Sequence, residues 1–222
     1  MSKVIIIGAS GMVGKAVLLE CLGHKDITHV LVIVRSESGI KHPKFKEVVH
    51  QDFSEFSSIS NELLGFDACF FCMGVSAVGM SKAEYEKITY NYTIALAKEL
   101  YNLNPEMTFN YVSGKGTDSS ENGRVHWARI KGKTENTILN MGFKQAFMFR
   151  PGAIIPLKGI KSKTRFYQFM YDYFTWAIII SKIFSPNSVI NTTQMGISMI
   201  NSISLGYDKK ILNPPDIIRL SK

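Results

Sequence analysis

Cysteine is scarce in this sequence, and its thiols do not form a disulfide framework. Cys21, Cys69 and Cys72 are odd in number, so they cannot all pair with one another. Cys69 and Cys72 fall within one apolar segment, and residues three apart on a strand face opposite sides of the sheet. This arrangement differs from the redox motif at a helix N-terminus, and no second pair of zinc ligands lies nearby. We therefore expect buried thiols in a reducing compartment and no metal site.

A long hydrophobic run is also missing. The longest one near the C-terminus covers residues 174–180, is interrupted by Thr175 and is flanked by Asp172 and Lys182. A membrane-spanning helix needs about 20 apolar residues, so this run is too short to cross a bilayer. The first residues lack the basic, apolar and small-residue stretches of a signal peptide. We expect a cytoplasmic protein without integral membrane association.

Acidic residues are few in the last third of the chain. Residues 1–149 carry 16 Lys and Arg against 15 Asp and Glu, whereas residues 150–222 carry 10 against 3. Such a basic region can face an acidic substrate, an anionic membrane or nucleic acid. It lacks the interleaved aromatic and basic residues of a nucleic-acid module, so we favour a solvated loop and expect no nucleic-acid partner. The local basic cluster consists of Lys158, Lys161, Lys163 and Arg165.

The sequence does contain a regular alternation of apolar runs and helical segments. Its 222 residues, 45% of them hydrophobic, suffice for one sizeable core. The predicted strands cover residues 3–8, 29–35, 47–50, 67–73, 108–113 and 145–149. The predicted helices cover residues 11–22, 57–64, 81–102 and 125–141. This alternation predicts an α/β fold with a doubly wound parallel sheet of the Rossmann type. We expect one domain over residues 1–222, in which a small helical region from about residue 153 supplies the substrate side.

A glycine-rich turn joins the first predicted strand to the first predicted helix. Gly8, Gly11 and Gly14 follow the apolar residues 4–7, at a spacing that differs from the simplest G-x-G-x-x-G fingerprint. Bare N–H groups at a helix N-terminus favour an anion, and the glycines allow a tight turn, close approach of a pyrophosphate and helix–strand packing. The alternative is a glycine turn that arose by chance. The predicted phosphate site consists of Gly8, Ser10, Gly11, Met12, Val13 and Gly14.

Further candidates follow the next strands, because doubly wound sheets bind ligands at the carboxyl ends of their strands. Arg35 and Ser36 follow the second strand, and a planar guanidinium suits a ribose 2′-phosphate, so we expect NADP rather than NAD. The alternative is a surface arginine, with Glu37 as the partner of a ribose hydroxyl. Asp52 and Phe53 follow the third strand and can contact an adenine, although Asp52 can equally cap a helix.

Two more turns lie at the same predicted edge of the sheet. A glycine after the fourth strand lets the chain pass close to a ligand, and a proline after the sixth makes a rigid turn. The residues that complete the predicted cofactor groove are Met73, Gly74, Val75, Pro151, Gly152, Ala153 and Ile154.

These features together resemble one known family. The turn GASGMVG, Arg35, Asp52, residues 69–74 and the run YVSGKGTDSS…WARIKGKTE…FRPGAII are similar to the short-chain dehydrogenase/reductase superfamily. Within it they resemble the atypical, NADPH-binding branch of the Tat-interacting oxidoreductase-like tumour suppressor. The resemblance is strong from residue 3 to about residue 157 and weaker through residues 191–193 and the helix that follows. It implies a Rossmann fold that carries NADP.

The resemblance also implies a catalytic set, which this sequence matches only in part. The family has a serine near the fifth strand end, which steadies the substrate oxygen, and a Tyr-x-x-x-Lys pair whose tyrosine transfers a proton. Lys131 matches the lysine that binds the ribose, unless it is an exposed helix lysine. Trp127 stands at the tyrosine position, and an indole has no proton to exchange near neutral pH. Ser113 matches the serine or merely ends the strand, and Asn91 matches a family asparagine near the nicotinamide or faces solvent.

Other residues can replace the tyrosine only if the fold brings one to the cleft. Histidine is a common proton donor, but adjacent helix residues diverge by about 100°, which turns His126 away from the position of Trp127. For Tyr90, Tyr92 and Tyr111 a core position is the favoured interpretation.

Three functions are compatible with these residues. The favoured one is an NADP(H)-binding protein with weak or no reductase turnover, such as a redox-responsive regulator with a protein partner. The alternative is an active NADPH-dependent oxidoreductase or epimerase-like enzyme on an unknown carbonyl substrate. Its proton would come from His126, a water or the substrate, and aromatic residues of segment 166–176 would wall its pocket. A binder of membrane surfaces or nucleic acid has only the basic charge in its favour.

Overall fold

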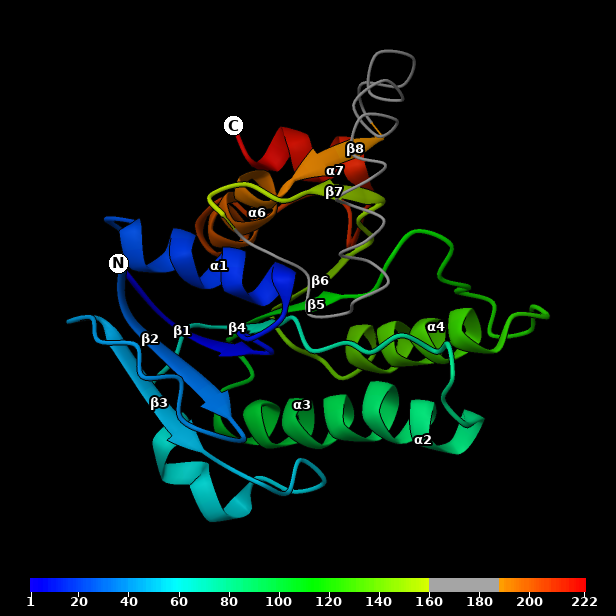
Figure 1. The fold of residues 1–222 in the computed structure, drawn as a ribbon, viewed down its shortest axis with the longest axis horizontal. Coiled ribbons are helices and arrows are strands. Elements are labelled where there is room, and N and C mark those ends of the chain that lie inside the picture. Colours follow the sequence, from blue (N-terminus) through cyan, green and yellow to red (C-terminus); the bar gives the residue numbers. More distant parts are fainter. Residues whose placement is uncertain (160–187) are drawn as a thin grey trace.

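The computed structural model describes residues 1–159 and 188–222, and its central element is a parallel sheet (Figure 1). Seven strands pair in the order β3-β2-β1-β4-β5-β6-β9, and every pairing is parallel. A reversal of strand order beside β1 is the mark of a doubly wound sheet, so the predicted fold class is confirmed. The strands are β1 (Ser2–Ile7), β2 (Ile27–Val34), β3 (Phe45–Val49), β4 (Ala68–Phe71), β5 (Thr108–Val112), β6 (Gln145–Phe149) and β9 (Ile211–Leu212).

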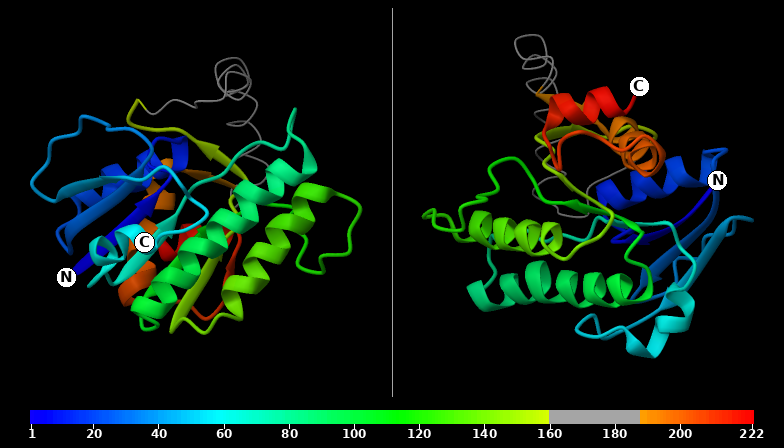
Figure 2. Two further views of the ribbon diagram at one scale, coloured as in Figure 1. Left: turned by 90° about the horizontal axis from the view of Figure 1, so that it is seen from below. Right: turned by 180° about the vertical axis from the view of Figure 1, so that it is seen from behind.

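Helices cover both faces of this sheet, as Figures 1 and 2 show. Helices α1 and α6 lie on one face, whereas α3 and α4 lie on the other. A separate two-stranded sheet of β7 (Ala153–Ile155) and β8 (Val189–Asn191) precedes α6. The helices are α1 (Met12–Gly23), α2 (Lys82–Glu86), α3 (Tyr92–Leu103), α4 (His126–Leu139), α6 (Thr192–Ser204) and α7 (Pro214–Leu220), with a 3₁₀ segment η1 (Ser57–Leu63) and a π segment η2 (Lys87–Asn91).

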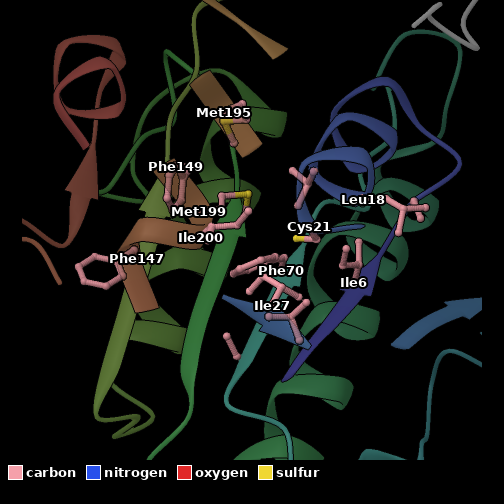
Figure 3. Close-up of a cluster of buried hydrophobic side chains, with 14 of the residues drawn as sticks. Ile6, Leu18, Cys21, Ile27, Phe70, Phe147, Phe149, Met195, Met199 and Ile200 are labelled. Carbon is pink, nitrogen blue, oxygen red and sulfur yellow. The ribbon is translucent and has the colours of Figure 1, made fainter. Parts of the chain in front are cut away.

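Two hydrophobic clusters fill the layers on either side of the sheet. One packs α1 and α6 against the sheet and includes Ile6, Phe70, Phe149 and Met199 (Figure 3). The other packs α3 and α4 against the opposite face and contains alternate strand residues such as Ile5. This alternation follows from the period of two in a strand, and burial on both faces explains the continuous apolar runs in the sequence.

The predicted cysteine geometry is confirmed. Cys69 lies in the cluster on the α3 side, whereas Cys72 packs against the cluster on the α1 side, and both are free thiols. Burial raises the pKa of Cys21, Cys69 and Cys72 above the ordinary value, so these thiols stay protonated at neutral pH.

Two sequence predictions about the secondary structure were wrong, and one strand of the main sheet was missed. The segment 81–102 is not one α-helix, because the π turn of η2 separates α2 from α3. Residues 57–63 form a 3₁₀ segment instead of an α-helix. The seventh strand, β9, was not predicted, since its two residues are too few to show a period. The basic residues Lys161, Lys163 and Arg165 and the aromatic segment 166–176 lie outside the described residues.

The region from residue 153 onward also contributes to the core. Helix α6 packs along α1, and Thr193 Oγ1 donates to Glu20 Oε1 at 2.9 Å. Glu20 Oε1 also accepts from Lys158 Nζ at 2.6 Å. Met195 and Met199 of α6 are fully buried. This region therefore stabilises the layer on the α1 side of the sheet, and its role on the substrate side stays a prediction.

Close packing of α4 against the loop that precedes it depends on Gly132. A Cβ atom at this position would lie 1.8 Å from the backbone oxygen of Asp118, which no real contact allows. In contrast, a Cβ atom at Gly23, the last residue of α1, would meet nothing within 4 Å.

Gly132→Ala should therefore destabilise the protein although alanine favours helices. Overpacking costs about 1 to 3 kcal/mol, and the gain in helix propensity offsets roughly 1 kcal/mol of it, so we expect a net loss of about 1 to 2 kcal/mol. Gly23→Ala is the control and should change stability by less than about 0.5 kcal/mol. Urea unfolding followed by circular dichroism measures both, and equal stability of the two variants would contradict the assigned packing.

Candidate functional site

The glycine turn has the close backbone contacts that its sequence predicted. Gly8 has φ +82°, and a Cβ atom there would lie 2.6 Å from the backbone nitrogen of Met73. A Cβ atom at Gly14 would lie 2.2 Å from the carbonyl oxygen of Gly8. The Gly11 N–H donates to the same oxygen at 2.9 Å and caps the start of α1. Gly8 and Gly14 therefore bring β1, β4 and the first turn of α1 together, and α1 begins with its N–H groups at the sheet edge.

Two cavities adjoin at this turn. The larger, of about 430 Å³, lies along the ends of β1 and β2, and the smaller, of about 310 Å³, extends toward the end of β4. Both are lined by Gly8, Ser10, Arg35, Phe53 and Met73. The predicted Ser36 lines the larger cavity, and the predicted Gly11, Met12, Gly74 and Val75 line the smaller. Together they form one groove across the point where the strand order reverses.

Sequence reasoning missed several residues of these cavities. Lys15 lines the larger cavity with Arg35, so two cationic side chains border it. A lysine directly behind the last glycine of the turn is a signal that could have identified it. Ile88 and Tyr92 line the smaller cavity. They come from η2 and α3, and no local pattern marks a helix residue that only the tertiary fold brings to a groove. The other lining residues that were not predicted are Ala9, Leu18, Val32, Ile33, Val34, Ser38, Ile40, Phe45 and Cys72.

Both candidates for the contact with the adenine-side ribose, the cationic Arg35 and the acidic Glu37, line the larger cavity. Arg35 is exposed, and its backbone oxygen accepts from Gln51 Nε2 at 2.6 Å, which fixes the end of β2. Glu37 lines the same cavity. The Ser38 N–H donates to Glu47 Oε1 at 3.1 Å, so the loop after β2 is held against β3.

Asp52 and Phe53 differ in their surroundings. Phe53 is 6% exposed, and it packs edge-on to Phe56 while lining both cavities. Asp52 is exposed, and its Oδ1 accepts from the Ser54 N–H at 2.9 Å. Hydrogen bonds from Ser54 hold the pKa of Asp52 below its ordinary value. Asp52 therefore closes a local turn and does not cap a helix, because the next segment, η1, has Phe56 as its N-cap. Its contact with an adenine stays a prediction.

A buried network fixes the other side of the sheet edge. Glu135 of α4 is fully buried and forms an ion pair with Arg150, whose Nε donates to Glu135 Oε1 at 3.0 Å. The Ser113 hydroxyl donates to Glu135 Oε1 and lies 3.2 Å from the Phe149 carbonyl oxygen. Ser113 is 6% exposed. These contacts favour the alternative in which Ser113 ends the strand, and a contact with substrate stays a prediction.

Lys131 and Trp127 lie one turn apart on α4, the helix that also carries Glu135. Lys131 Nζ donates to the Ser113 carbonyl oxygen. Burial lowers the pKa of Lys131 to about 8, and the nearby Glu135 carboxylate opposes that shift. The Trp127 ring is partly buried, and a Cβ atom at Gly116 would lie 3.3 Å from its Cη2. The tryptophan thus packs on the turn after β5, and its match to the family tyrosine stays a prediction.

Of the alternative proton donors, Tyr92 lines the smaller cavity and also packs against the cluster on the α3 side, whereas the other three line neither cavity. His126 is the first residue of α4, and its ring centroid lies 6.1 Å from that of Tyr85. Tyr111 is buried in the core, where burial raises the pKa of its hydroxyl. Tyr90 packs with Lys133, whose Nζ lies 4.2 Å from the ring centroid.

Several predicted residues lie apart from the two cavities. Asn91 is exposed at the end of η2. The Pro151 carbonyl oxygen accepts from the Lys115 N–H at 2.9 Å, and a Cβ atom at Gly152 would lie 2.9 Å from the Ser188 carbonyl oxygen. The residues that do not line either cavity are Val13, Gly14, Asp52, Asn91, Ser113, Lys131, Pro151, Gly152, Ala153 and Ile154. Their roles toward a cofactor or substrate stay predictions.

Known proteins resemble this chain in sequence. No family model matches it. The rat protein HTATIP2 (Rattus norvegicus) is 27% identical over 155 residues, which cover 69% of this chain and 63% of that protein. The fungal protein fmp52-1 of Aspergillus terreus, named as mitochondrial, is 27% identical over 160 residues and matched over 67% of its length. The chain thus spans about two thirds of these relatives. Among the described residues no helix is long and apolar enough to cross a membrane, and the cytoplasmic location stays a prediction.

Solved structures share the fold. The UDP-N-acetylglucosamine 4-epimerase of Methanobrevibacter ruminantium superposes with a TM-score of 0.69 and 14% identity over 95% of this chain and 74% of that one. The PhqB reductase domain of Penicillium fellutanum reaches a TM-score of 0.65 at 15% identity over 95% and 66%. The chain therefore shares its fold with these solved structures and is similar in sequence to HTATIP2 and fmp52-1, in line with the resemblance that its motifs predicted.

Proposed function

We propose that the chain binds NADP(H) in the groove made by the two cavities and reduces carbonyl compounds weakly or not at all. The observation that carries this proposal is the continuity of the groove, because both cavities meet at Gly8, Ser10 and Arg35. The family supports a nicotinamide dinucleotide as the ligand. When bound, such a dinucleotide supplies or accepts a hydride at its nicotinamide ring.

The residues of the groove fit the parts of this ligand. The first N–H groups of α1 and the Ser10 hydroxyl would bind the pyrophosphate, and Phe53 would pack on the adenine. Arg35 and Lys15 would hold the ribose 2′-phosphate, since a guanidinium binds phosphate oxygens in pairs and an ammonium adds charge. Two cations on the rim of the larger cavity therefore favour NADP over NAD. Lys131 would donate to the hydroxyls of the nicotinamide ribose.

Trp127 is the reason for expecting little turnover. It occupies the position from which the family tyrosine exchanges a proton, and its indole N–H can only donate a hydrogen bond near neutral pH. The alternative is an active oxidoreductase or epimerase-like enzyme, and the titratable Lys131 next to this position favours it. One of the structural neighbours above is a 4-epimerase and the other is a reductase domain, so both chemistries occur on this fold.

Trp127→Tyr should restore the missing acid–base group and raise the rate of carbonyl reduction. General acid–base catalysis contributes about 10²- to 10⁴-fold, so we expect at least a tenfold increase in NADPH oxidation over a panel of aldehydes and ketones. Trp127→Phe is the matched control, since it removes the indole without supplying a hydroxyl. Fast turnover by the wild type would overturn the proposal of weak activity and establish the alternative.

Arg35→Asp should weaken the binding of NADP far more than that of NAD. Loss of a bidentate phosphate contact and its replacement by a negative charge predict at least a tenfold rise in Kd for NADP+, measured by calorimetry. Lys98→Asp, an equal charge change at an exposed site on α3, serves as the control. Equal weakening of both dinucleotides by Arg35→Asp would show that Arg35 does not contact the 2′-phosphate.

The affinity for NADP+ should fall as the pH rises through about 8. The Lys131 pKa lies near 8, so the ammonium that favours ribose oxygens is present below this value and is lost above it. Because the ligand binds the charged form better, it also raises the pKa of Lys131 in the complex. Binding measured between pH 6.5 and 9.5 should show this decline in the wild type and a flatter profile in Lys131→Gln. Parallel profiles would contradict a contact between Lys131 and the cofactor.

A further inference from the structure

Lys115 occupies a fixed position at the carboxyl edge of the sheet. It lies just after β5, and its backbone N–H donates to the Pro151 carbonyl oxygen beyond β6 at 2.9 Å. On its far side Gly116 has φ +89°, and the Thr117 hydroxyl donates to the Gly114 carbonyl oxygen at 2.8 Å. The backbone of this turn is therefore determined on both sides of the lysine.

The side chain of Lys115 runs from the end of β5 toward the end of β6. Its Cδ lies 3.7 Å from the place that a Cβ atom of Gly152 would occupy. The residue is exposed, so the ammonium beyond this Cδ lies at the surface of the edge where doubly wound sheets bind ligands.

The other charged side chains at this edge already have ion-pair or hydrogen-bond partners. Arg150 pairs with the buried Glu135, and Lys131 donates to the Ser113 carbonyl oxygen. The carboxylate of Asp118 accepts from the Gly123 N–H at 2.7 Å and from Ser120. In the part of the chain that the structure describes, none of the ion pairs includes Lys115.

The strand order separates Lys115 from the phosphate-binding turn. The turn follows β1, whereas Lys115 lies between the ends of β5 and β6, and β4 stands between β1 and β5. A cation here is thus on the side of the proposed reaction and not at the cofactor phosphates.

We propose that Lys115 is a specificity-determining residue that binds an anionic group of the substrate, so that the substrate class is a carbonyl or hydroxy compound bearing a carboxylate or phosphate. This inference rests on the proposed function, because it needs a dinucleotide in the groove. An ammonium that has a fixed backbone and no carboxylate partner among the described residues gains a charge-assisted hydrogen bond when such a group binds. A neutral substrate would leave it hydrated and gain nothing from it.

Matched probes test this inference without requiring turnover. Calorimetry first measures the binding of NADP+, and then the binding to the NADP+-saturated protein of three benzaldehydes that carry a para carboxylate, a para phosphate ester or a para carboxamide. The wild type should bind at least one anionic probe about fivefold to tenfold more tightly than the carboxamide. The anionic probe that binds more tightly shows whether the substrate group is a carboxylate or a phosphate. Added salt should reduce this preference.

Variants of the lysine provide the controls. Lys115→Met should abolish the preference for the anion, and Lys115→Arg should restore most of it. Lys98→Met removes the same charge from an exposed site on α3 and should keep the preference. The NADP+ titration of each variant reports a folding or cofactor defect separately.

The outcomes separate this inference from the proposed function. Failure of the wild type to bind any dinucleotide overturns the proposed function, and this inference falls with it. Dinucleotide binding with equal affinity for the charged and neutral probes, or with no binding of any probe, overturns the role of Lys115 alone. A preference that survives in Lys115→Met overturns it too.

Discussion

The buried ion pair of Glu135 and Arg150 is the interaction on which the geometry of the candidate site depends. It joins α4 to the end of β6, and through the Ser113 hydroxyl it includes the end of β5. A carboxylate without solvent is tolerated only when it is fully paired, and removing one partner of such a pair costs about 3 to 5 kcal/mol. This constraint sets the height and rotation of α4 over the sheet, and therefore the positions of Trp127 and Lys131.

A second constraint, the backbone contact between Gly8 and Gly14, fixes the opposite half of the groove. It brings the N-terminus of α1 against the end of β1 at a distance that admits no side chain. The molecule thus has two separately anchored halves at one sheet edge. The half at β1 and β2 contains the cavities and the two cations that line the larger one, Arg35 and Lys15. The half at β5 and β6 contains the buried network, with the partly buried Lys131 beside it and Lys115 at the surface.

The fold was predictable because its evidence is repeated along the chain. Six apolar runs alternate with helical segments, and the runs of β1, β2, β4, β5 and β6 are buried on both faces of a parallel sheet, whereas the edge strand β3 is partly exposed. Features that depend on one or two residues were not predictable. The π turn at Lys87–Asn91 inserts a register shift that no periodicity marks, and the two-residue strand β9 is shorter than one period. Its pairing comes from β6, which is distant in sequence.

The sequence by itself determined the chain's fold class, its glycine turn and the spacing of Trp127 and Lys131 on one helix, because these depend on residue type and local spacing. Only the tertiary structure decided what each polar residue contacts. Ser113 donates to Glu135, 22 residues away, and Asp52 caps its own turn, while Tyr92 and Lys15 reach the groove. The physical reason is that a hydrogen bond or an ion pair depends on which side chains the packed layers bring within about 3 Å, and such pairs leave no periodic trace in the sequence.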